Sequence, residues 1–469
     1  MKIKIINKKL EFLPNLMNAG DFWAIEEALR MYNPIVGPIK SITSQFNTPC
    51  GVPIYCFTAH HFDFHKVIGK KVSKDFIPAG GKGRTLWGAF MGTLGEAIER
   101  FLPLISYDFL KSRIVYGTPK GLQREGYEVL GPDRLYLFAK EQYKKSFFKQ
   151  FTEDTYLGWI DGENVLTKEK IYAPAQLIIF GYKPVKGEIP IGYAVSGGLT
   201  CHTDEEEGRY HGFTEFIERD QLNIRWVCGF PPKEVVLDSD NFALQKLMDG
   251  FFFFDNPYVK MKIYHWSLDL PEVHVLSIHC VNTSSIKVKY LPGVGSDVSF
   301  YHALRKALAE LGQADKVYFT VASGEGKLPY WMDISPDAKF EEVSDLFKTI
   351  AYYGFDKNLK KVEDFYNRSE KVQHSSLVIS ESKENGRNKY QKLLKILKEK
   401  KLTPLCFDLT PPCFQKLKLQ RCFIPELTMY FIVHGYYGHI RYYNLGKELG
   451  LVTRIFSFDD LNKAPLPFP

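Results

Sequence analysis

Two glutamates and an arginine recur at the same spacing in two separate parts of the chain. The pattern Glu-x-x-Glu-Arg occupies residues 96–100 and returns at residues 215–219. Because positions i, i+3 and i+4 share one face of a helix, each copy directs two carboxylates and a guanidinium to the same side. Four converging carboxylates repel one another unless cations lie between them, and hard divalent ions prefer oxygen ligands. The sequence therefore predicts a metal–nucleotide site whose metal ligands are Glu96, Glu99, Glu215 and Glu218.

The segments that must position these carboxylates have the pattern of amphipathic helices. The alternative is that each charged face is simply solvated, as on most amphipathic helices. Two copies in the same helical phase weaken that alternative without removing it, so the flanking residues decide. The apolar residues expected to face the core are Leu94, Ala97, Ile98 and Phe101 in the first segment and Phe213, Phe216 and Ile217 in the second.

Composition places the chain among ordinary globular proteins. Its 469 residues are 45% hydrophobic and 25% charged, which suits one large α/β unit or two to three domains. The net charge of +7 is small for this length, so nucleic acid is not an expected partner. No apolar run reaches the ~18–20 residues of a membrane span, and the N-terminus lacks the apolar region of a secretory signal. We expect a cytoplasmic protein with no membrane segment, whose eight scattered cysteines stay reduced.

Helical and strand-like segments alternate along the chain, which predicts an α/β or α+β fold. A third helix is expected over residues 300–314, where Glu310 and Gln313 share a face. Residues 104–190 are rich in loops and have the pattern of a connecting insertion. Besides the two motif helices, the other expected helices cover residues 22–32 and 387–400, and the expected strands cover residues 39–46, 54–57, 156–160, 171–180 and 405–409.

Taken in order, these motifs resemble the YcaO family of ATP-dependent enzymes. The resemblance rests on Gly81-Lys82-Gly83 before the first pattern, on Ser196-Gly-Gly-Leu-Thr200 before the second, and on the Ala303–Gln313 helix. It covers roughly residues 30–440. It implies a YcaO-like fold with an ATP site between helices, and ATP and Mg2+ as cofactors. The nucleotide-binding residues implied are Lys82, Arg100, Thr200, Thr203, Glu207, Arg219, Lys306, Glu310 and Gln313.

Some of these positions depart from the usual family pattern. Gly92 stands where the family generally has Ser, Thr200 and Thr203 where Ser or Ala and Asn are typical, and Lys306 where Arg is usual. Lysine keeps the charge of arginine but loses its bidentate fork. Lys82 has an alternative as an ordinary solvated loop lysine. Nucleotide binding remains the expectation, while the individual phosphate contacts remain open.

The chain ends in a Pro-x-Pro-x-Pro tail formed by Pro465, Pro467 and Pro469. Alternating prolines favour an extended, stiff segment, although chain ends are often frayed. Within the YcaO family such a tail resembles that of azoline-forming cyclodehydratases, where it reaches the active site. The resemblance therefore implies that all three prolines are catalytic-site residues, with the terminal carboxylate of Pro469 as the base.

The activity that the resemblance implies is backbone cyclodehydration of a ribosomally made precursor peptide. A Cys, Ser or Thr side chain attacks the preceding amide, ATP phosphorylates the amide oxygen, and loss of phosphate leaves a thiazoline or oxazoline. The alternatives are other YcaO chemistry, such as thioamide or amidine formation, and a non-catalytic YcaO-like scaffold.

The partners implied are the precursor peptide, a ThiF-like or winged-helix protein that binds its leader, and an FMN-dependent azoline dehydrogenase in a bacteriocin-type multienzyme complex. A homodimer of this chain within that complex is also expected. Residues 1–45 are too few for a separate leader-binding winged-helix domain, so we expect none. The expected organisation is an N-terminal segment over residues 1–45, a catalytic domain over residues 46–440 and a C-terminal segment over residues 441–469.

Overall fold

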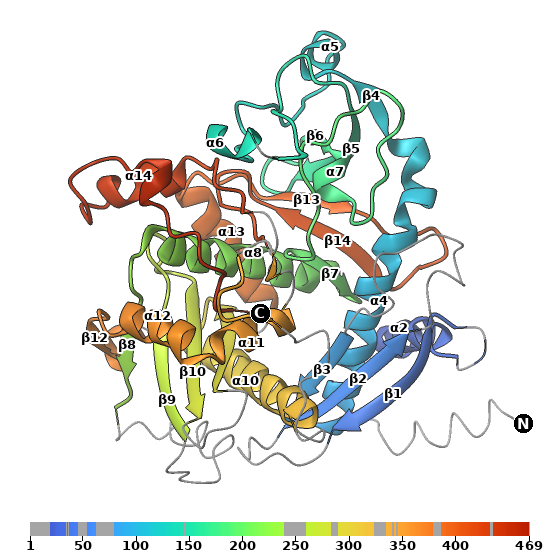
Figure 1. The fold of residues 1–469 in the computed structure, drawn as a ribbon. Coiled ribbons are helices and arrows are strands. Elements are labelled where there is room, and N and C mark those ends of the chain that lie inside the picture. Colours follow the sequence, from blue (N-terminus) through green and yellow to red (C-terminus); the bar gives the residue numbers. More distant parts are fainter. Residues whose placement is uncertain are drawn as a thin grey trace, which may run out of the picture.

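The computed structural model of the protein contains three sheets in the part of the chain that it describes. Long helices α4 (Leu86–Leu110), α8 (Glu205–Cys228) and α10 (Phe300–Ala322) lie between and against these sheets (Figure 1). The mixed helix-and-sheet fold predicted from the sequence is confirmed. The described residues are 19–33, 35, 37–45, 54–61, 79–144, 146–238, 259–282, 289–322, 334–339, 342–343, 346–378, 386–431 and 435–468.

The first sheet is an antiparallel three-stranded unit that presses on α4. Its order is β1 (Ile39–Gln45), β2 (Tyr55–His61) and β3 (Ala79–Gly83). The glycines of β3 allow the close approach, because a Cβ at Gly81 would lie 2.2 Å from the carbonyl oxygen of Ala89. Helix α2 (Ala19–Arg30) also contacts α4. The glycine-rich strand is therefore held directly beside the first motif helix.

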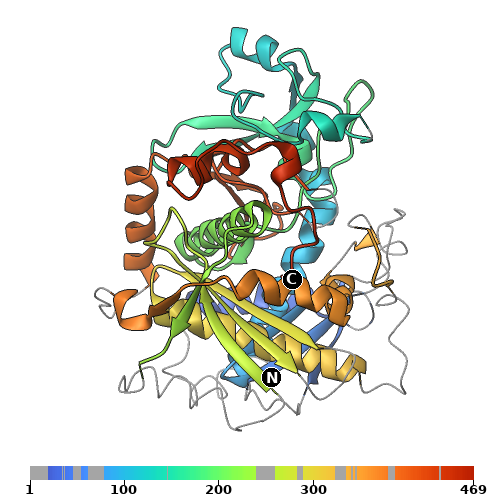
Figure 2. The same cartoon turned by 60° about the vertical axis from the view of Figure 1, so that its left-hand side comes forward.

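The second sheet has the order β11-β10-β9-β8-β12 and carries α10 on one face. Strand β12 pairs in parallel with β8, and the other pairs are antiparallel. Figure 2 shows α10 crossing the strands of this sheet. The strands are β8 (Lys233–Val236), β9 (Val259–His265), β10 (His274–Asn282), β11 (Tyr290–Asp297) and β12 (Lys371–Gln373), and the nearby helices are α11 (Leu346–Tyr353), α12 (Asp356–Tyr366) and the 3-10 turn η4 (His374–Ser376).

The third sheet joins distant parts of the chain and supports α8. Its order is β4-β5-β13-β14-β7, with β6 paired to β5, so strands from within residues 104–190 share a sheet with strands near residue 420. The strands are β4 (Val115–Gly117), β5 (Leu157–Asn164), β6 (Lys170–Pro174), β7 (Leu199–His202), β13 (Leu405–Asp408) and β14 (Lys418–Phe423). The surrounding helices are η1 (Lys111–Arg113), α5 (Pro119–Arg124), α6 (Lys140–Tyr143), α7 (Ala175–Ile178), α13 (Gly386–Glu399), α14 (Arg441–Glu448) and η5 (Phe458–Asp460).

The strand predicted over residues 171–180 is wrong beyond Pro174. Strand β6 ends there and α7 begins at Ala175. Proline has no N–H for the sheet ladder and fixes φ near −65°, so the strand cannot continue through it in a regular way. The other strands and helices expected from the sequence occur, with boundaries that differ by a few residues, and α10 extends to Ala322.

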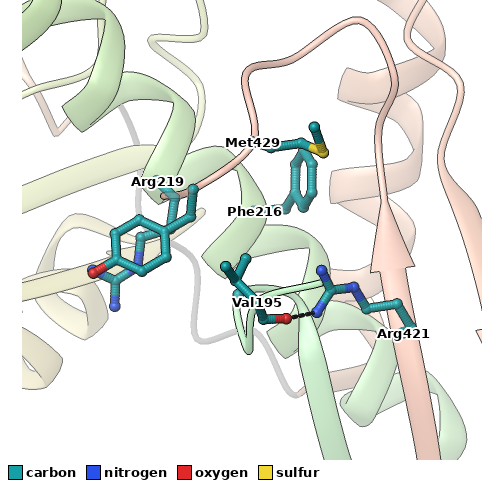
Figure 3. A pocket seen from close by; sticks show the side chains of 7 residues that line it. Val195, Phe216, Arg219, Arg421 and Met429 are labelled. Atoms are coloured by element: carbon teal, nitrogen blue, oxygen red, sulfur yellow. Dashed lines mark hydrogen bonds between the residues drawn. The ribbon is translucent and has the colours of Figure 1, made fainter. Parts of the chain in front are cut away.

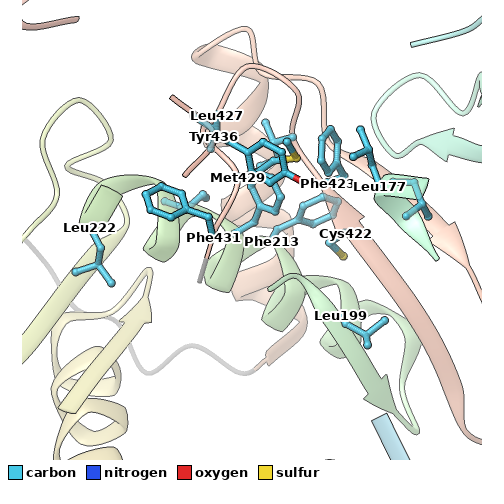
Figure 4. Close-up of a cluster of buried hydrophobic side chains, with 14 of the residues drawn as sticks. Leu177, Leu199, Phe213, Leu222, Cys422, Phe423, Leu427, Met429, Phe431 and Tyr436 are labelled. Atoms are coloured by element: carbon cyan, nitrogen blue, oxygen red, sulfur yellow. The ribbon is translucent and has the colours of Figure 1, made fainter. Parts of the chain in front are cut away.

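Helix α8 has clear start and stop signals and is largely enclosed. Asp204 caps it by accepting a 2.9 Å hydrogen bond from the backbone N–H of Glu207, and three glutamates follow in the first turn. Gly229 ends it in the left-handed conformation at φ 71°. Figure 4 shows Phe213 among apolar side chains from β14 and from the segment after it. This packing fixes the face of α8 that carries the second motif.

Candidate functional site

The first motif helix is joined to α10 through the glycine-rich strand β3. The side chain of Glu96 accepts a 3.1 Å hydrogen bond from the backbone N–H of Gly80. Gln313 on α10 donates to the carbonyl oxygen of Gly80 at 2.9 Å, and Lys82 Nζ lies 3.3 Å from Glu310 Oε2. Glu310 and Gln313 of α10 therefore both contact the glycine-rich strand β3.

The second motif is held by the glycine turn that precedes it. Glu215 accepts a 3.1 Å hydrogen bond from the backbone N–H of Gly198, which adopts φ +78°. Because this left-handed conformation strains any residue with a side chain, glycine is required at this position. Arg219 Nε lies 3.9 Å from Glu215 Oε1 and 3.7 Å from Glu218 Oε1. The turn therefore fixes the rotamer of the leading carboxylate.

The two copies and α10 act on one another electrostatically, which places their acids in one region. The pKa of Glu99 is raised to about 8, first by desolvation and then by Glu215 and Glu96, although Arg100 opposes the shift. The pKa of Glu218 is raised to about 7 by burial, with Glu310 and Glu215 adding to the shift and Arg219 opposing it. Carboxyl groups in this condition are stabilised as anions when a cation joins them.

Cations from three elements accompany these acids. Arg100 lies 3.5 Å from Glu96, and its Nε is buried without a hydrogen-bond partner among the described residues. Arg219 belongs to α8 and Lys82 to β3. The arrangement can hold a polyanion such as a triphosphate between helices, provided that metal ions separate the phosphates from the carboxylates.

The residues present fit a magnesium–nucleotide complex better than a metal held by protein alone. Within the described ranges, no three acidic, histidine or cysteine side chains are grouped so as to hold a metal ion. Mg2+ commonly takes only one or two carboxylates and completes its shell with phosphate oxygens and water. The carboxylates that could supply such ligands are Glu96, Glu99, Glu215 and Glu218.

The remaining predicted contacts are Thr200, Thr203, Glu207 and Lys306, and of these Lys306 is reached by the charge of Glu218. Thr200 on β7 is buried beside α8, and its hydroxyl has no hydrogen-bond partner among the described residues. Thr203 is exposed and precedes the cap of α8. Glu207 lies 4.0 Å from His211. Lys306 Nζ donates to the carbonyl oxygen of Ser296 at 2.8 Å and lies 3.3 Å from Asp297, which is buried. The structure therefore gives Lys306 a protein partner of opposite charge.

Two residues of the site were missed at the level of sequence. Arg421 on β14 is only 2% exposed, and burial lowers its pKa to about 10 against the opposing effect of Glu215. Figure 3 shows Arg421 and Arg219 around one small pocket, where Arg421 donates to the carbonyl oxygen of Val195. Arg421 stands in the mixed polar and apolar strand Lys-Leu-Gln-Arg-Cys-Phe, which gave no distinct signal. The second residue, Tyr430, lies in an irregular segment that gave no signal.

The proline tail is bound along the molecule up to Phe468. Tyr353 donates its hydroxyl hydrogen to the carbonyl oxygen of Pro465, and Tyr290 donates to that of Pro467 at 3.2 Å. The ring of Phe468 packs edge-on against Trp266, with 4.8 Å between centroids. Both described prolines are buried, and Figures 1 and 2 show this segment running into the interior. Pro469, the predicted base, lies outside the described residues.

Comparison with known families accounts for most of the chain. Residues 80–428 match the family model described as "YcaO cyclodehydratase, ATP-ad Mg2+-binding". The protein therefore belongs to the YcaO family, and its cofactors are ATP and Mg2+. A curated but uncharacterized protein from Methanothermobacter thermautotrophicus is 30% identical over 96 residues, which are 20% of this chain and 25% of that protein.

Solved structures show the same fold at low sequence identity. A heterocyclase in complex with substrate and cofactor has a TM-score of 0.70 and 16% identity, covering 95% of this chain and 57% of its own. YcaO from Methanopyrus kandleri bound with AMPPCP and Mg2+ has a TM-score of 0.58 and 15% identity, covering 87% and 90%. A chain of the E. coli microcin synthetase McbBCD complex has a TM-score of 0.54 and 14% identity, and the match covers 93% of this chain and 98% of that one. The chain thus spans just over half of the first of these structures.

None of the helices in the described part of the chain combines the length and the apolar character that crossing a bilayer requires. The longest of them, α4, carries Glu96, Glu99 and Arg100 near its middle.

Proposed function

We propose that the protein is an ATP-dependent cyclodehydratase that converts Cys, Ser or Thr residues of a ribosomally made precursor peptide to thiazolines or oxazolines. The observation that carries the proposal is that acids from α4, α8 and α10 interact in one region while the proline tail is bound in the interior. Membership of the YcaO family supports the ATP dependence. The tail supports azoline formation over the other reactions of the family.

The reaction closes a ring and removes one water from the peptide for each ATP consumed. The substrate's thiol or hydroxyl adds to the preceding amide carbon, which places the former carbonyl oxygen on a tetrahedral carbon. When bound, Mg2+-ATP would supply the phosphoryl group that turns this oxygen into a leaving group. Loss of phosphate together with the amide proton then forms the C=N bond, and the other products are ADP and phosphate.

The protein's own residues would bind the magnesium ions, neutralise the phosphate charge and accept the amide proton. The four motif glutamates would hold the magnesium ions, and Arg100, Arg219 and Lys82 would offset the phosphate charge. The terminal carboxylate of Pro469 would accept the amide proton, which requires an acceptor placed within hydrogen-bond distance. A tail that is bound up to Phe468 would lower the entropy cost of placing a terminal carboxylate.

We propose partners as well as a substrate. The precursor peptide would be presented by a separate ThiF-like or winged-helix protein that binds its leader, and an FMN-dependent dehydrogenase would oxidise azolines to azoles. A homodimer of this chain within the assembly is part of the same proposal. Peptide-dependent ATP turnover by this chain alone, equal to that with the leader-binding protein added, would argue against the need for that partner.

The test appends two glycines after Pro469. The tail is held through carbonyl oxygens and the Phe468 ring, so the extension leaves these contacts in place and moves the carboxylate by up to about 7 Å. Cyclisation, measured by mass spectrometry as loss of one water per ring, should fall about 100-fold or more, whereas nucleotide binding should persist. A two-glycine extension at the N-terminus is the matched control. Unchanged cyclisation would favour a YcaO reaction that does not use the tail.

A further inference from the structure

Tyr430 lies two residues beyond the part of the chain that the family model matches. Its ring lies under the guanidinium of Arg219, with 4.8 Å between the guanidinium carbon and the ring centroid. That distance is within the range of cation–π contacts, which strengthen when the pair is removed from water. The side chain of Arg219 is 14% exposed, so this contact is largely shielded.

The carboxylates of Glu215 and Glu218 lie near Arg219 at ion-pair distances. The distances from Arg219 Nε to the oxygens of Glu215 and Glu218 are 3.9 and 3.7 Å, which exceed hydrogen-bond length. A flat guanidinium on an aromatic face keeps its N–H groups in one plane, directed past the ring edge. The stacking contact with Tyr430 therefore holds the guanidinium over the face of the ring.

The segment that carries Tyr430 is fastened to the same helix as Arg219. Thr428 donates its backbone N–H and its hydroxyl to Asp220 Oδ1, at 2.7 and 3.0 Å. One turn further along α8, Asn223 Nδ2 donates to the carbonyl oxygen of Met429 at 3.0 Å. All three bonds involve the two residues that precede Tyr430, so they fix the position of its ring relative to Arg219.

We propose that Tyr430 is a positioning residue that fixes the guanidinium of Arg219 for contact with the nucleotide phosphates. The charges of Arg219, Glu215, Arg100 and Glu310 all act on Tyr430, which places the ring within the acid-rich region. The inference rests on the proposed function for its reaction, but the binding of a nucleotide tests it without that reaction. It gives the segment that follows β14 a part in the nucleotide site.

The experiment measures the Kd of a non-hydrolysable ATP analogue with Mg2+ by calorimetry. Tyr430→Met keeps apolar volume but removes the aromatic face, and it should raise the Kd about tenfold. Tyr430→Phe keeps the face and should restore wild-type binding. Tyr443→Leu is the matched control, because Tyr443 is also half-buried in the C-terminal segment but donates to Tyr437 instead. Tyr430→Leu replaces Tyr430→Met if the latter does not fold.

A double-mutant cycle decides whether Tyr430 acts through Arg219. In an Arg219→Gln background, which has no cation to stack on the ring, Tyr430→Met should add no further loss of affinity. Full additivity, an unchanged Kd for Tyr430→Met, or an equal loss for Tyr443→Leu would each overturn the inference. A protein that binds the analogue as expected but forms no azoline would overturn the proposed reaction and leave the role of Tyr430 standing.

Discussion

At the scale of single residues, Glu215 is a motif carboxylate whose charge reaches groups on several elements. It is held by the backbone N–H of Gly198 at 3.1 Å, and its charge affects Glu99, Glu218 and Arg421. A residue that couples to both motif helices and to β14 belongs at the centre of the site. The scaffold alternative, in which no ATP is consumed, gives this residue no such role.

We predict that Glu215→Gln lowers ATP turnover by about 100- to 1000-fold with little change in folding. The amide keeps the shape and can still accept from Gly198, but it loses the charge that would face a metal ion. Phosphate release in the presence of peptide measures the effect. Glu363→Gln on α12, which is exposed, is the control. Wild-type turnover in Glu215→Gln would support the scaffold alternative.

The residues that the sequence proposed for the candidate site are mostly ones that belong to regular helices. Helical spacing is enough to place Glu96 beside Glu99 and Glu215 beside Glu218, because it depends only on local geometry. Arg421 and Tyr430 escaped prediction because each reaches the site through tertiary packing of β14 and the segment after it. No local pattern records that contact.

At the scale of elements, α14 is tied to α8 by a buried ion cluster. Arg441 lies 2.8 Å from Asp220 and 2.9 Å from Asp269, and Asp220 also accepts from Thr428. The guanidinium holds the pKa of Asp269 below its ordinary value against the effect of burial. The cluster therefore links α8 to α14. Its carboxylate on α8, Asp220, directly follows Arg219 in the sequence.

We predict that Arg441→Ala destabilises the protein by about 3–5 kcal/mol, because it leaves two enclosed carboxylates without their partner. Thermal or urea unfolding measures the loss. Arg454→Ala is the matched control, since Arg454 pairs with Asp460 at an exposed position on the same segment, and it should barely move the unfolding midpoint. Equal effects of the two substitutions would contradict a structural role for the buried cluster.

At the scale of the whole molecule, the sequence predicted the fold class but not the arrangement of sheets. Alternating segments indicate helices and strands, and the family resemblance supplied the architecture. The pairing of β5 with β13 joins residues near 163 to residues near 406, and nothing in the local sequence specifies a contact at that separation. The strand predicted over residues 171–180 ends at Pro174, where α7 follows, so local sequence also failed to predict where this element ends.

Histidines buried across the second sheet and the C-terminal segment make stability depend on pH. Burial lowers the pKa of His274 and of His439 to about 4 and puts those of His265 and His279 well below 6.5. The unfolded chain binds protons at these positions once the pH falls below about 6.5, whereas the folded chain does not. Stability is therefore fully present above that pH and is lost as the pH falls towards 4.

We predict that each of these histidines lowers the free energy of unfolding by about 1–2 kcal/mol between about pH 7 and pH 5, while the raised pKa values of Glu99 and Glu218 oppose part of this fall. Urea unfolding at the two pH values measures the change. His439→Gln removes one such group, which lies beside Arg441 and interacts with the carbonyl oxygen of Pro425 at 3.3 Å, so this variant should lose less stability on acidification than the wild type. An equal fall in both proteins would show that the imidazole of His439 is not kept neutral by burial.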